Sequence, residues 1–251
     1  MKVTMTKDGG ETRSSGHNLA LGQGPPGSRG PKRALSPTQI ARAAIQIADA
    51  DGLGSVTMKR VAQELGVTTM ALYRYFPGKA DLVSLMIDSA GDSAPPFRKS
   101  SLPWHKRLKL WAHCCLKIYR EHPWFLEATS ARHSLMGPNE LSWMEAALQM
   151  LAEAGLRPQE RHHAFLAIIG HVRGYATFKQ MRRQVASGQH RGQDLLHYLR
   201  TEADRFPESL EVLGAGVFTE KSDIAFDFGI DCILTGIRSK VGKRSSRRSS
   251  G

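Results

Sequence analysis

Residues 56–76 read VTMKRVAQELGVTTMALYRYF, and this stretch indicates two short helices joined by a tight turn. In each half, apolar residues recur at the three-to-four-residue spacing of one helix face. They are Val61, Ala62 and Leu65 in the first half and Leu72 and Phe76 in the second. Gly66 lies between the halves and supplies the backbone freedom that a sharp corner between helices requires. The pattern therefore predicts a helix-turn-helix.

The side of the second helix that faces away from this apolar stripe suits the major groove of DNA. Its residues are Thr69, Met70, Tyr73 and Arg74, flanked by Ala71 and Tyr75. Hydroxyls can bond base edges or phosphates, methyl-bearing side chains can meet thymine methyls, and arginine can reach phosphate or guanine. No acidic residue occurs between Gly66 and Lys79. A plain helical hairpin with a solvated face is the alternative, but such faces usually mix charges of both signs.

Cations on the neighbouring helices extend the predicted DNA-binding face. Lys59 and Arg60 lie on the first helix, which would cross the DNA backbone. Lys79 begins the next helix, where free backbone amides and the helix dipole also favour a phosphate. The complete set of predicted DNA contacts is Lys59, Arg60, Thr68, Thr69, Met70, Ala71, Tyr73, Arg74, Tyr75 and Lys79.

Helical periodicity continues through most of the chain. The segment SPTQI at 36–40 is a strong helix start, with Ser36 as the cap and Gln39 as its capping-box partner. After the helix-turn-helix, further helices are predicted at 78–91, 103–121, 123–130, 138–154, 158–185, 191–205 and 219–241. We find no alternating pattern long enough for a strand. The predicted fold class is all-α, with an N-terminal three-helix DNA-binding domain and a C-terminal helical ligand-binding and dimerisation domain.

Composition divides the chain into four parts. Residues 1–34 are rich in Gly, Ser and Pro and cannot bury enough apolar surface to fold, so they are expected to form a disordered basic arm. The DNA-binding domain is predicted at 35–90, with a break at 91–102. The regulatory and dimerisation domain is predicted at 91–241, followed by a disordered basic tail at 242–251.

The net charge of +12 favours a polyanionic partner. Most of the excess lies at the two ends, 1–34 and 238–251. Bulk charge therefore supports DNA binding without locating it in the folded part. No apolar run is long enough to span a membrane, and the N-terminus has no apolar core of signal-peptide type. Three cysteines without framework spacing do not predict disulfides, so we expect a cytoplasmic protein without a membrane partner.

The stretch from Leu35 to Ile87 resembles the TetR family of transcriptional regulators. The matching segments, in one ungapped register, are the first helix up to Asp51 and Gly52, then 55–62, 65–67, 71–76 and 79–82. The resemblance implies that Lys59 contacts the groove and that Thr69, Met70 and Tyr73 read bases and backbone. It also implies that Tyr75 and Lys79 hold phosphates.

Residues 103–241 contain no motif typical of catalysis, such as a glycine-rich phosphate loop, a nucleophile elbow or paired carboxylates. We therefore expect no enzyme activity and no cofactor. A metal site is not favoured either. His163 and His171 are two helical turns apart, too far for two ligands of one metal from one helix.

Aromatic and polar side chains in the same region are candidates for a ligand pocket between helices. Plain core packing is the alternative for each of them. The candidates are Trp111, His113, Tyr119, Trp143, His171, Arg173, Tyr175 and Phe178. The predicted partner is a small-molecule effector of unknown identity.

Two long predicted helices, 158–185 and 219–241, combine apolar residues with glycines that permit close approach. We expect them to form a four-helix bundle with their copies in a second subunit, as the family resemblance also implies. Packing within one subunit is the alternative. The candidate interface residues are Ile168, Phe178, Ile224 and Phe228.

These observations predict a ligand-responsive transcriptional regulator, acting as a repressor. It would bind a palindromic double-stranded DNA operator as a homodimer, because two recognition helices must read two half-sites. A small molecule would release it. Two alternatives remain: a small-molecule-binding protein or enzyme with an incidental helix-turn-helix, and a regulator that activates or does not respond to ligand.

Overall fold

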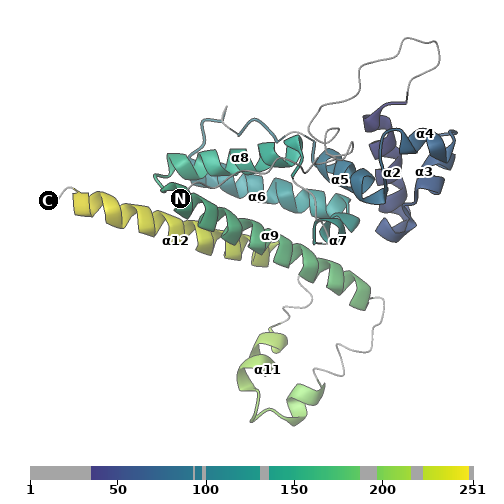
Figure 1. The fold of residues 1–251 in the computed structure, drawn as a ribbon. Coiled ribbons are helices and arrows are strands. Elements are labelled where there is room, and N and C mark those ends of the chain that lie inside the picture. The colour runs from purple at the N-terminus through teal and green to yellow at the C-terminus, as the bar shows by residue number, and fades with distance from the viewer. Residues whose placement is uncertain are drawn as a thin grey trace, which may run out of the picture. The chain divides into compact units, whose positions relative to one another are not determined.

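The computed structural model describes residues 35–92, 94–97, 100–130, 136–186, 197–215 and 223–248. Every regular element in these ranges is a helix, which confirms the predicted all-α fold (Figure 1). None of the helices described is long and apolar enough to cross a membrane. The chain forms two compact units: unit 1 contains residues up to Pro96 together with Glu121–Ala146, and unit 2 contains Phe97–Arg120 together with Ala147–Gly251. The expected basic arm at 1–34 lies outside the described residues.

Unit 1 begins with the helices predicted around the helix-turn-helix. They are α2 (Pro37–Asp51), the short 3-10 turn η1 (Leu53–Ser55), α3 (Met58–Glu64), α4 (Thr69–Tyr73) and α5 (Lys79–Ala90). The predicted capping box starts α2: Ser36 Oγ accepts from the Gln39 amide and Gln39 Oε1 accepts from the Ser36 amide. The helices share a core that includes Ile40, Val61, Leu72, Phe76, Leu82 and Met86, all fully buried. Burial of this apolar surface holds the two short helices at the corner.

Two carboxylates connect the later part of unit 1 to its first helices. Asp49 on α2 accepts from Trp124 Nε1 at 2.7 Å and pairs with His122 Nδ1 at 2.8 Å, where α7 (Trp124–Ser130) begins. Asp88 on α5 accepts from the backbone amides of Asn139 and Glu140 at 2.9 and 3.1 Å, in the first turn of α8 (Pro138–Glu153). These bonds explain why residues 121–146 belong to the compact unit of the helix-turn-helix, although the sequence suggested a boundary at 91–102.

Unit 2 is built on α6 (Trp104–Glu121), the second half of α8, α9 (Pro158–Ala186) and α12 (Ile224–Arg248). Helices α9 and α12 lie side by side (Figure 1). Large apolar side chains from all four helices are buried here. They include Leu108, Trp111, Leu116, Met150, Leu151, Ile168, Val172, Phe226 and Ile230. Their burial supplies the driving force for packing these helices.

The C-terminal third differs from the prediction in two places. Of the helix predicted at 191–205, the described residues are helical at 197–201, and α11 (Pro207–Gly214) follows where no helix was predicted. Pro207 at the first position and Glu208 in the first turn of α11 are the start signals that were overlooked. The tail expected to be disordered from residue 242 is helical to Arg248. Lys and Arg are good helix formers and favour the C-terminal end of the helix dipole.

Candidate nucleic-acid interface

The two helices of the helix-turn-helix are each started by a threonine. Thr57 Oγ1 accepts from the Arg60 amide at 3.1 Å, and Thr68 Oγ1 accepts from the Ala71 amide at 3.3 Å. Between them Gly66 has φ +66°, a left-handed conformation that glycine adopts without strain. The local sequence therefore fixes where α3 ends and where α4 starts.

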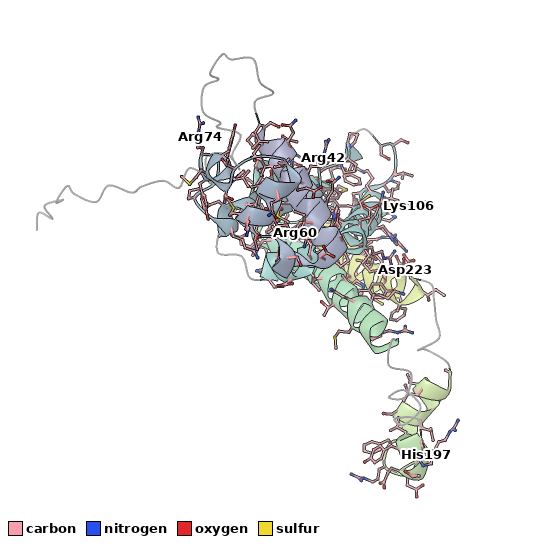
Figure 2. The ribbon with its side chains drawn as sticks, turned by 90° about the vertical axis from the view of Figure 1, so that its right-hand side faces the viewer. Arg42, Arg60, Arg74, Lys106, His197 and Asp223 are labelled. Carbon is pink, nitrogen blue, oxygen red and sulfur yellow. The ribbon has the colours of Figure 1, made fainter. Side chains whose placement is uncertain are left out.

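Helix α4 has one buried side and one exposed side. Leu72 is fully buried, as is Phe76 just beyond the helix, whereas Met70 and Tyr73 remain 72% and 46% exposed. Large apolar and aromatic side chains with this much exposure are uncommon on a face meant only for water. Arg74 extends from the same end of the motif (Figure 2). The side of α4 predicted to recognise DNA is therefore exposed to solvent, with Thr68 exposed and Thr69 and Ala71 half-buried at its edges.

The cations beside α4 are exposed, but two of them also hold the fold together. Lys59 is exposed on α3. Arg60 forms an ion pair with Asp51 at the end of α2. Lys79 Nζ donates to the carbonyl oxygen of Leu53 at 3.2 Å and retains further N–H donors for a phosphate. Arg42, exposed on α2, is a further cation that the sequence analysis did not select.

Tyr75 has a structural contact that the sequence did not indicate. Its hydroxyl donates to the carbonyl oxygen of Leu35 at 2.6 Å, which ties the start of α2 to the end of the helix-turn-helix. The single hydroxyl proton is therefore already used within the protein. A phosphate contact by Tyr75 would require this bond to exchange, so we assign the residue a positioning role and leave it out of the proposed DNA contacts.

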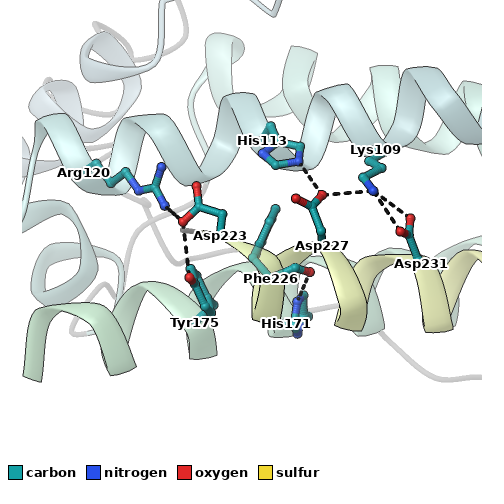
Figure 3. Close-up of polar contacts among 9 residues, drawn as sticks. All are labelled: Lys109, His113, Arg120, His171, Tyr175, Asp223, Phe226, Asp227 and Asp231. Carbon is teal, nitrogen blue, oxygen red and sulfur yellow. Dashed lines mark hydrogen bonds and ion pairs between the residues drawn. The ribbon is translucent and has the colours of Figure 1, made fainter. Parts of the chain in front are cut away.

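In unit 2, three of the predicted pocket residues converge on one aromatic ring (Figure 3). His113 on α6 and His171 and Tyr175 on α9 surround Phe226 of α12, with ring centroids 4.9, 5.2 and 5.3 Å away. Phe226 itself is fully buried. The sequence analysis missed it because nothing in the spacing of α12 shows which of its phenylalanines faces α6 and α9.

Two aspartates on α12 form ion pairs with side chains of α6 beside this aromatic cluster (Figure 3). Asp227 pairs with His113 Nε2 at 3.0 Å and with Lys109 Nζ at 2.9 Å, and Asp231 also pairs with Lys109. Partial burial acts to raise the pKa of Asp227, but hydrogen bonds from Lys109 and His113 outweigh it and hold that pKa below its ordinary value. The bonds to Asp231 and Asp227 raise the pKa of Lys109. These charges therefore stabilise one another across the α6–α12 contact.

A second ion pair lies just before the start of α12, at Asp223 (Figure 3). Asp223 pairs with Arg120 of α6 and accepts from the Tyr175 hydroxyl at 3.2 Å. Burial acts to raise the pKa of Asp223, but the hydrogen bond and charge of Arg120, followed by Tyr175, keep it below its ordinary value. His171 Nε2 lies 3.0 Å from the carbonyl oxygen of Phe226. The polar atoms of His113, His171 and Tyr175 are thus bonded inside the unit, as in a packed core.

The other predicted pocket residues have separate environments. Trp111 is buried and packs against Phe165, with ring centroids 6.0 Å apart. Trp143 belongs to unit 1, where its Nε1 donates to the carbonyl oxygens of Gly91 and Asp92. Tyr119 and Arg173 are half-buried and Phe178 is exposed. Within the described ranges, no three His, Cys, Asp or Glu residues are grouped as a metal site would require.

The four predicted interface residues divide into two groups. Ile168 is 1% exposed and belongs to the core between α9 and α12, so we remove it from the interface. Phe178, Ile224 and Phe228 are 45%, 63% and 71% exposed. Leu166 and Met181 on α9 are further exposed apolar residues. Helices α9 and α12 therefore pack together on one side and leave large apolar side chains uncovered on another.

Comparison with known proteins decides the family. Residues 40–86 match the family described as bacterial regulatory proteins, tetR family, and residues 99–241 match the tetracyclin repressor-like C-terminal domain. The chain is 35% identical over 228 residues to the HTH-type transcriptional repressor DrrR1 of Streptomyces coeruleorubidus, covering 86% of this chain and 82% of DrrR1. The chain belongs to the TetR family. It is therefore a DNA-binding transcriptional regulator, and the resemblance found in its first ninety residues extends over both halves.

Solved structures agree with this TetR-family fold. Apo ActR from Streptomyces coelicolor superimposes with a TM-score of 0.73 at 24% identity, covering 85% of this chain and 99% of ActR. A structure of BioQ with its natural double-stranded DNA operator gives a TM-score of 0.53 at 26% identity. The match covers 61% of this chain and 93% of the BioQ chain.

Proposed function

We propose that this TetR-family regulator is a repressor that binds a palindromic operator as a homodimer and is released by a small molecule. The observation that carries the proposal is the exposed, acid-free face of the helix-turn-helix. Its contacts would be made by Lys59, Arg60, Thr68, Thr69, Met70, Ala71, Tyr73, Arg74 and Lys79. Repression follows the description of DrrR1, and the protein would act on DNA in the bacterial cytoplasm.

Recognition of base pairs would come mainly from the most exposed side chains of α4. Met70 can pack against thymine methyls, and Arg74 can reach guanine or phosphate. The Tyr73 hydroxyl can donate to a phosphate at the groove edge. The complex of BioQ with its operator supports this use of the motif.

Homodimer formation would use the uncovered face of α9 and α12. Phe178, Ile224 and Phe228 lose their exposed apolar surface when a second copy of the same helix pair covers them. Close approach of the helices is possible because Gly170, Gly174 and Gly236 on this pair have open space around their Cα atoms. To read a palindrome on one face of DNA, the two α4 helices of such a dimer would need to reach half-sites about 34–36 Å apart.

The effector would bind in unit 2. Structures of ActR in complex with actinorhodin and with (S)-DNPA support a small organic ligand for a regulator of this architecture. Release requires only that the ligand bind the DNA-incompatible state more tightly, and couplings of about 1–3 kcal/mol are typical. The bonds of Asp49 and Asp88 would then carry a change in residues 121–146 to α2 and α5 of the same unit.

Selection of bound DNA from a random duplex pool tests the proposal directly. We expect a palindromic sequence to be enriched, because two symmetry-related α4 helices would read it. Failure to enrich any sequence would contradict operator binding, and an enriched sequence without symmetry would contradict the dimer. A reporter gene placed behind the selected site then separates repression from activation by the sign of the change when the regulator is deleted.

The alternative of an enzyme with an incidental helix-turn-helix is not favoured. Family similarity covers both halves of the chain, including residues 99–241, where such an enzyme would need its active site. In that region His113 and Asp227 come together, but they pair with each other beside Lys109 and support the packing of α12 on α6.

A further inference from the structure

Basic residues gather at one end of unit 2, away from the helix-turn-helix in the sequence. Lys106 on α6, Arg157 just before α9, and Arg238 and Lys240 on α12 are all exposed. Contacts bring these segments together: Lys240 lies 3.8 Å from Glu160, which also accepts from Arg157. Val241 packs near Gly155 in the turn between α8 and α9. The end of α12 therefore lies beside the first turn of α9.

The acids at this end are already paired. Glu160 is 10% exposed and is shared by Arg157 and Lys240. Glu153 forms an ion pair with the buried Arg107. These two carboxylates cannot offset the remaining cations, so the local potential is positive.

Two of these cations also act on the nearby side chain of His105. Burial, and then the positive charges of Arg238 and Lys106, lower the pKa of this histidine. An approaching anion would be attracted by the same charges that disfavour a protonated imidazole.

Beyond Val241 the helix consists of basic and small residues only. Residues 242–248 read GKRSSRR and remain helical. Positions 240, 243, 244, 247 and 248 recur every three or four residues, which places these basic positions along one side of the helix.

We propose that the C-terminal end of α12, with the exposed cations beside it, is a second DNA-binding surface that contacts phosphates without reading sequence. This surface goes beyond operator recognition by α4. The absence of any aliphatic or aromatic residue in 242–251 argues against a membrane, because an interfacial helix needs an apolar face to enter the bilayer. It also leaves no apolar anchor for a protein partner, whereas a phosphate backbone requires only charge.

The test measures binding of the full-length protein to a labelled duplex of scrambled sequence over a range of salt concentrations. The variant R244Q/R247Q/R248Q keeps good helix formers and removes three charges. Each lost phosphate contact lowers the slope of log affinity against log salt by about 0.9, so we expect a decrease of about 2–3 for each subunit whose C-terminal helix contacts the duplex, and at least about tenfold weaker binding at low salt. The matched control K179Q/R200Q/R205Q removes three charges elsewhere in unit 2 and should leave the slope unchanged.

Two further measurements, the affinity ratio for operator and scrambled duplex and the binding to lipid vesicles, complete the test. The ratio of operator affinity to scrambled-duplex affinity should stay constant in the C-terminal variant, because α4 is intact. A lower ratio with an unchanged salt slope on the scrambled duplex would contradict the proposal, because it would assign these arginines to operator recognition. A slope equal to that of the control would overturn the proposal. So would weaker binding of the C-terminal variant to anionic phosphatidylserine vesicles with an unchanged DNA slope, which would assign the basic helix to a lipid surface. Circular dichroism checks that both variants retain their helix content.

Discussion

The outer face of α4 and the cluster around Phe226 are built in opposite ways. Helix α4 has five residues and presents Met70 and Tyr73 to solvent, with Leu72 as its anchor in the core. Around Phe226 the side chains are packed. His113 Nε2 is bonded to Asp227 of α12, and the Tyr175 hydroxyl donates to Asp223 just before α12. Substitutions on the first region should therefore change DNA binding with little loss of stability. Substitutions in the second should change stability first.

The largest effect is expected from a charge placed on the uncovered face of α12. Phe228→Glu should prevent dimer formation, because a carboxylate would be buried without a partner in the four-helix bundle. The apparent mass in light scattering should fall to that of one chain. Operator affinity should fall by about a hundredfold or more, since specific DNA binding gains about 4–10 kcal/mol over non-specific binding.

Val212→Glu is the matched control for this substitution. Val212 is 53% exposed on α11 and belongs to the same unit as Phe228. We expect this variant to remain a dimer with unchanged operator affinity. A dimeric Phe228→Glu protein would show that the uncovered face of α9 and α12 is not the subunit interface.

Removal of the tyrosine ring from α4 should produce the next largest effect. Tyr73→Ala removes one contact in each half-site, and a single contact contributes about 1–3 kcal/mol, so operator affinity should fall by about a hundredfold. Tyr198→Ala is the control, because Tyr198 is exposed to nearly the same extent, 49% against 46%. Fluorescence anisotropy measures affinity, and thermal melting should be nearly the same for both variants. Unchanged affinity in Tyr73→Ala would remove this residue from the recognition face.

The contrast between the two regions also explains which features the sequence could predict. The recognition face depends on neighbours in one short segment: Thr57 and Thr68 as caps, Gly66 at the turn, and the Leu72 stripe. Local spacing contains all of this information. The same is true of the Ser36 capping box. The structure confirms the capping box, the turn at Gly66 and the buried Leu72 stripe, while DNA recognition by the outer face stays a prediction.

The Phe226 cluster depends on contacts between residues about fifty or more positions apart. His113 and Asp227 meet across 114 positions, and Lys109 and Asp231 across 122. Helical periodicity assigns a residue to a face of its own helix but does not say which helix covers that face. For this reason His113, His171 and Tyr175 could be selected as candidates, while their shared contact with Phe226 could not.

A glycine inside this long-range cluster provides the next test. A Cβ atom at Gly229 would lie 2.2 Å from Cε1 of His171, so Gly229→Ala must displace the imidazole that stacks on Phe226. Overpacking of this kind costs about 1–3 kcal/mol, and we expect a loss at the upper end in chemical denaturation. Gly242→Ala on the same helix is the control, because a Cβ there meets nothing within 4 Å. Equal stability of the two variants would contradict the close packing of His171 against α12.

The carboxylate that joins α5 to α8 should show a smaller effect. Asp88→Ala leaves the Asn139 and Glu140 amides without their acceptor, and loss of such a cap costs about 1 kcal/mol. Asp88→Asn keeps an oxygen acceptor and should recover most of the stability, since Asn and Asp cap helices equally well. Denaturation of unit 1, followed by Trp124 or Trp143 fluorescence, measures the difference. An Asn variant as unstable as the Ala variant would argue that the charge of Asp88, and not its hydrogen bonds, matters.

The smallest effect concerns the response of the second region to acid. The pKa of Asp223 is held below its ordinary value of 3.8, with Arg120 on α6 and Tyr175 and Lys179 on α9 facing the carboxylate. A group with a lowered pKa stabilises the folded state above its ordinary pKa, and this contribution disappears as the pH falls through the folded-state value. The melting temperature of the wild type should therefore fall more steeply than that of Asp223→Asn between about pH 5 and pH 3, by the equivalent of less than about 1 kcal/mol for this partly exposed pair. Asp204→Asn, on an exposed turn, should follow the wild-type curve. Parallel curves for wild type and Asp223→Asn would mean that the ion pair with Arg120 adds no pH-dependent stability, and that α12 is held on α6 by the packing around Phe226 and the ion pairs of Lys109.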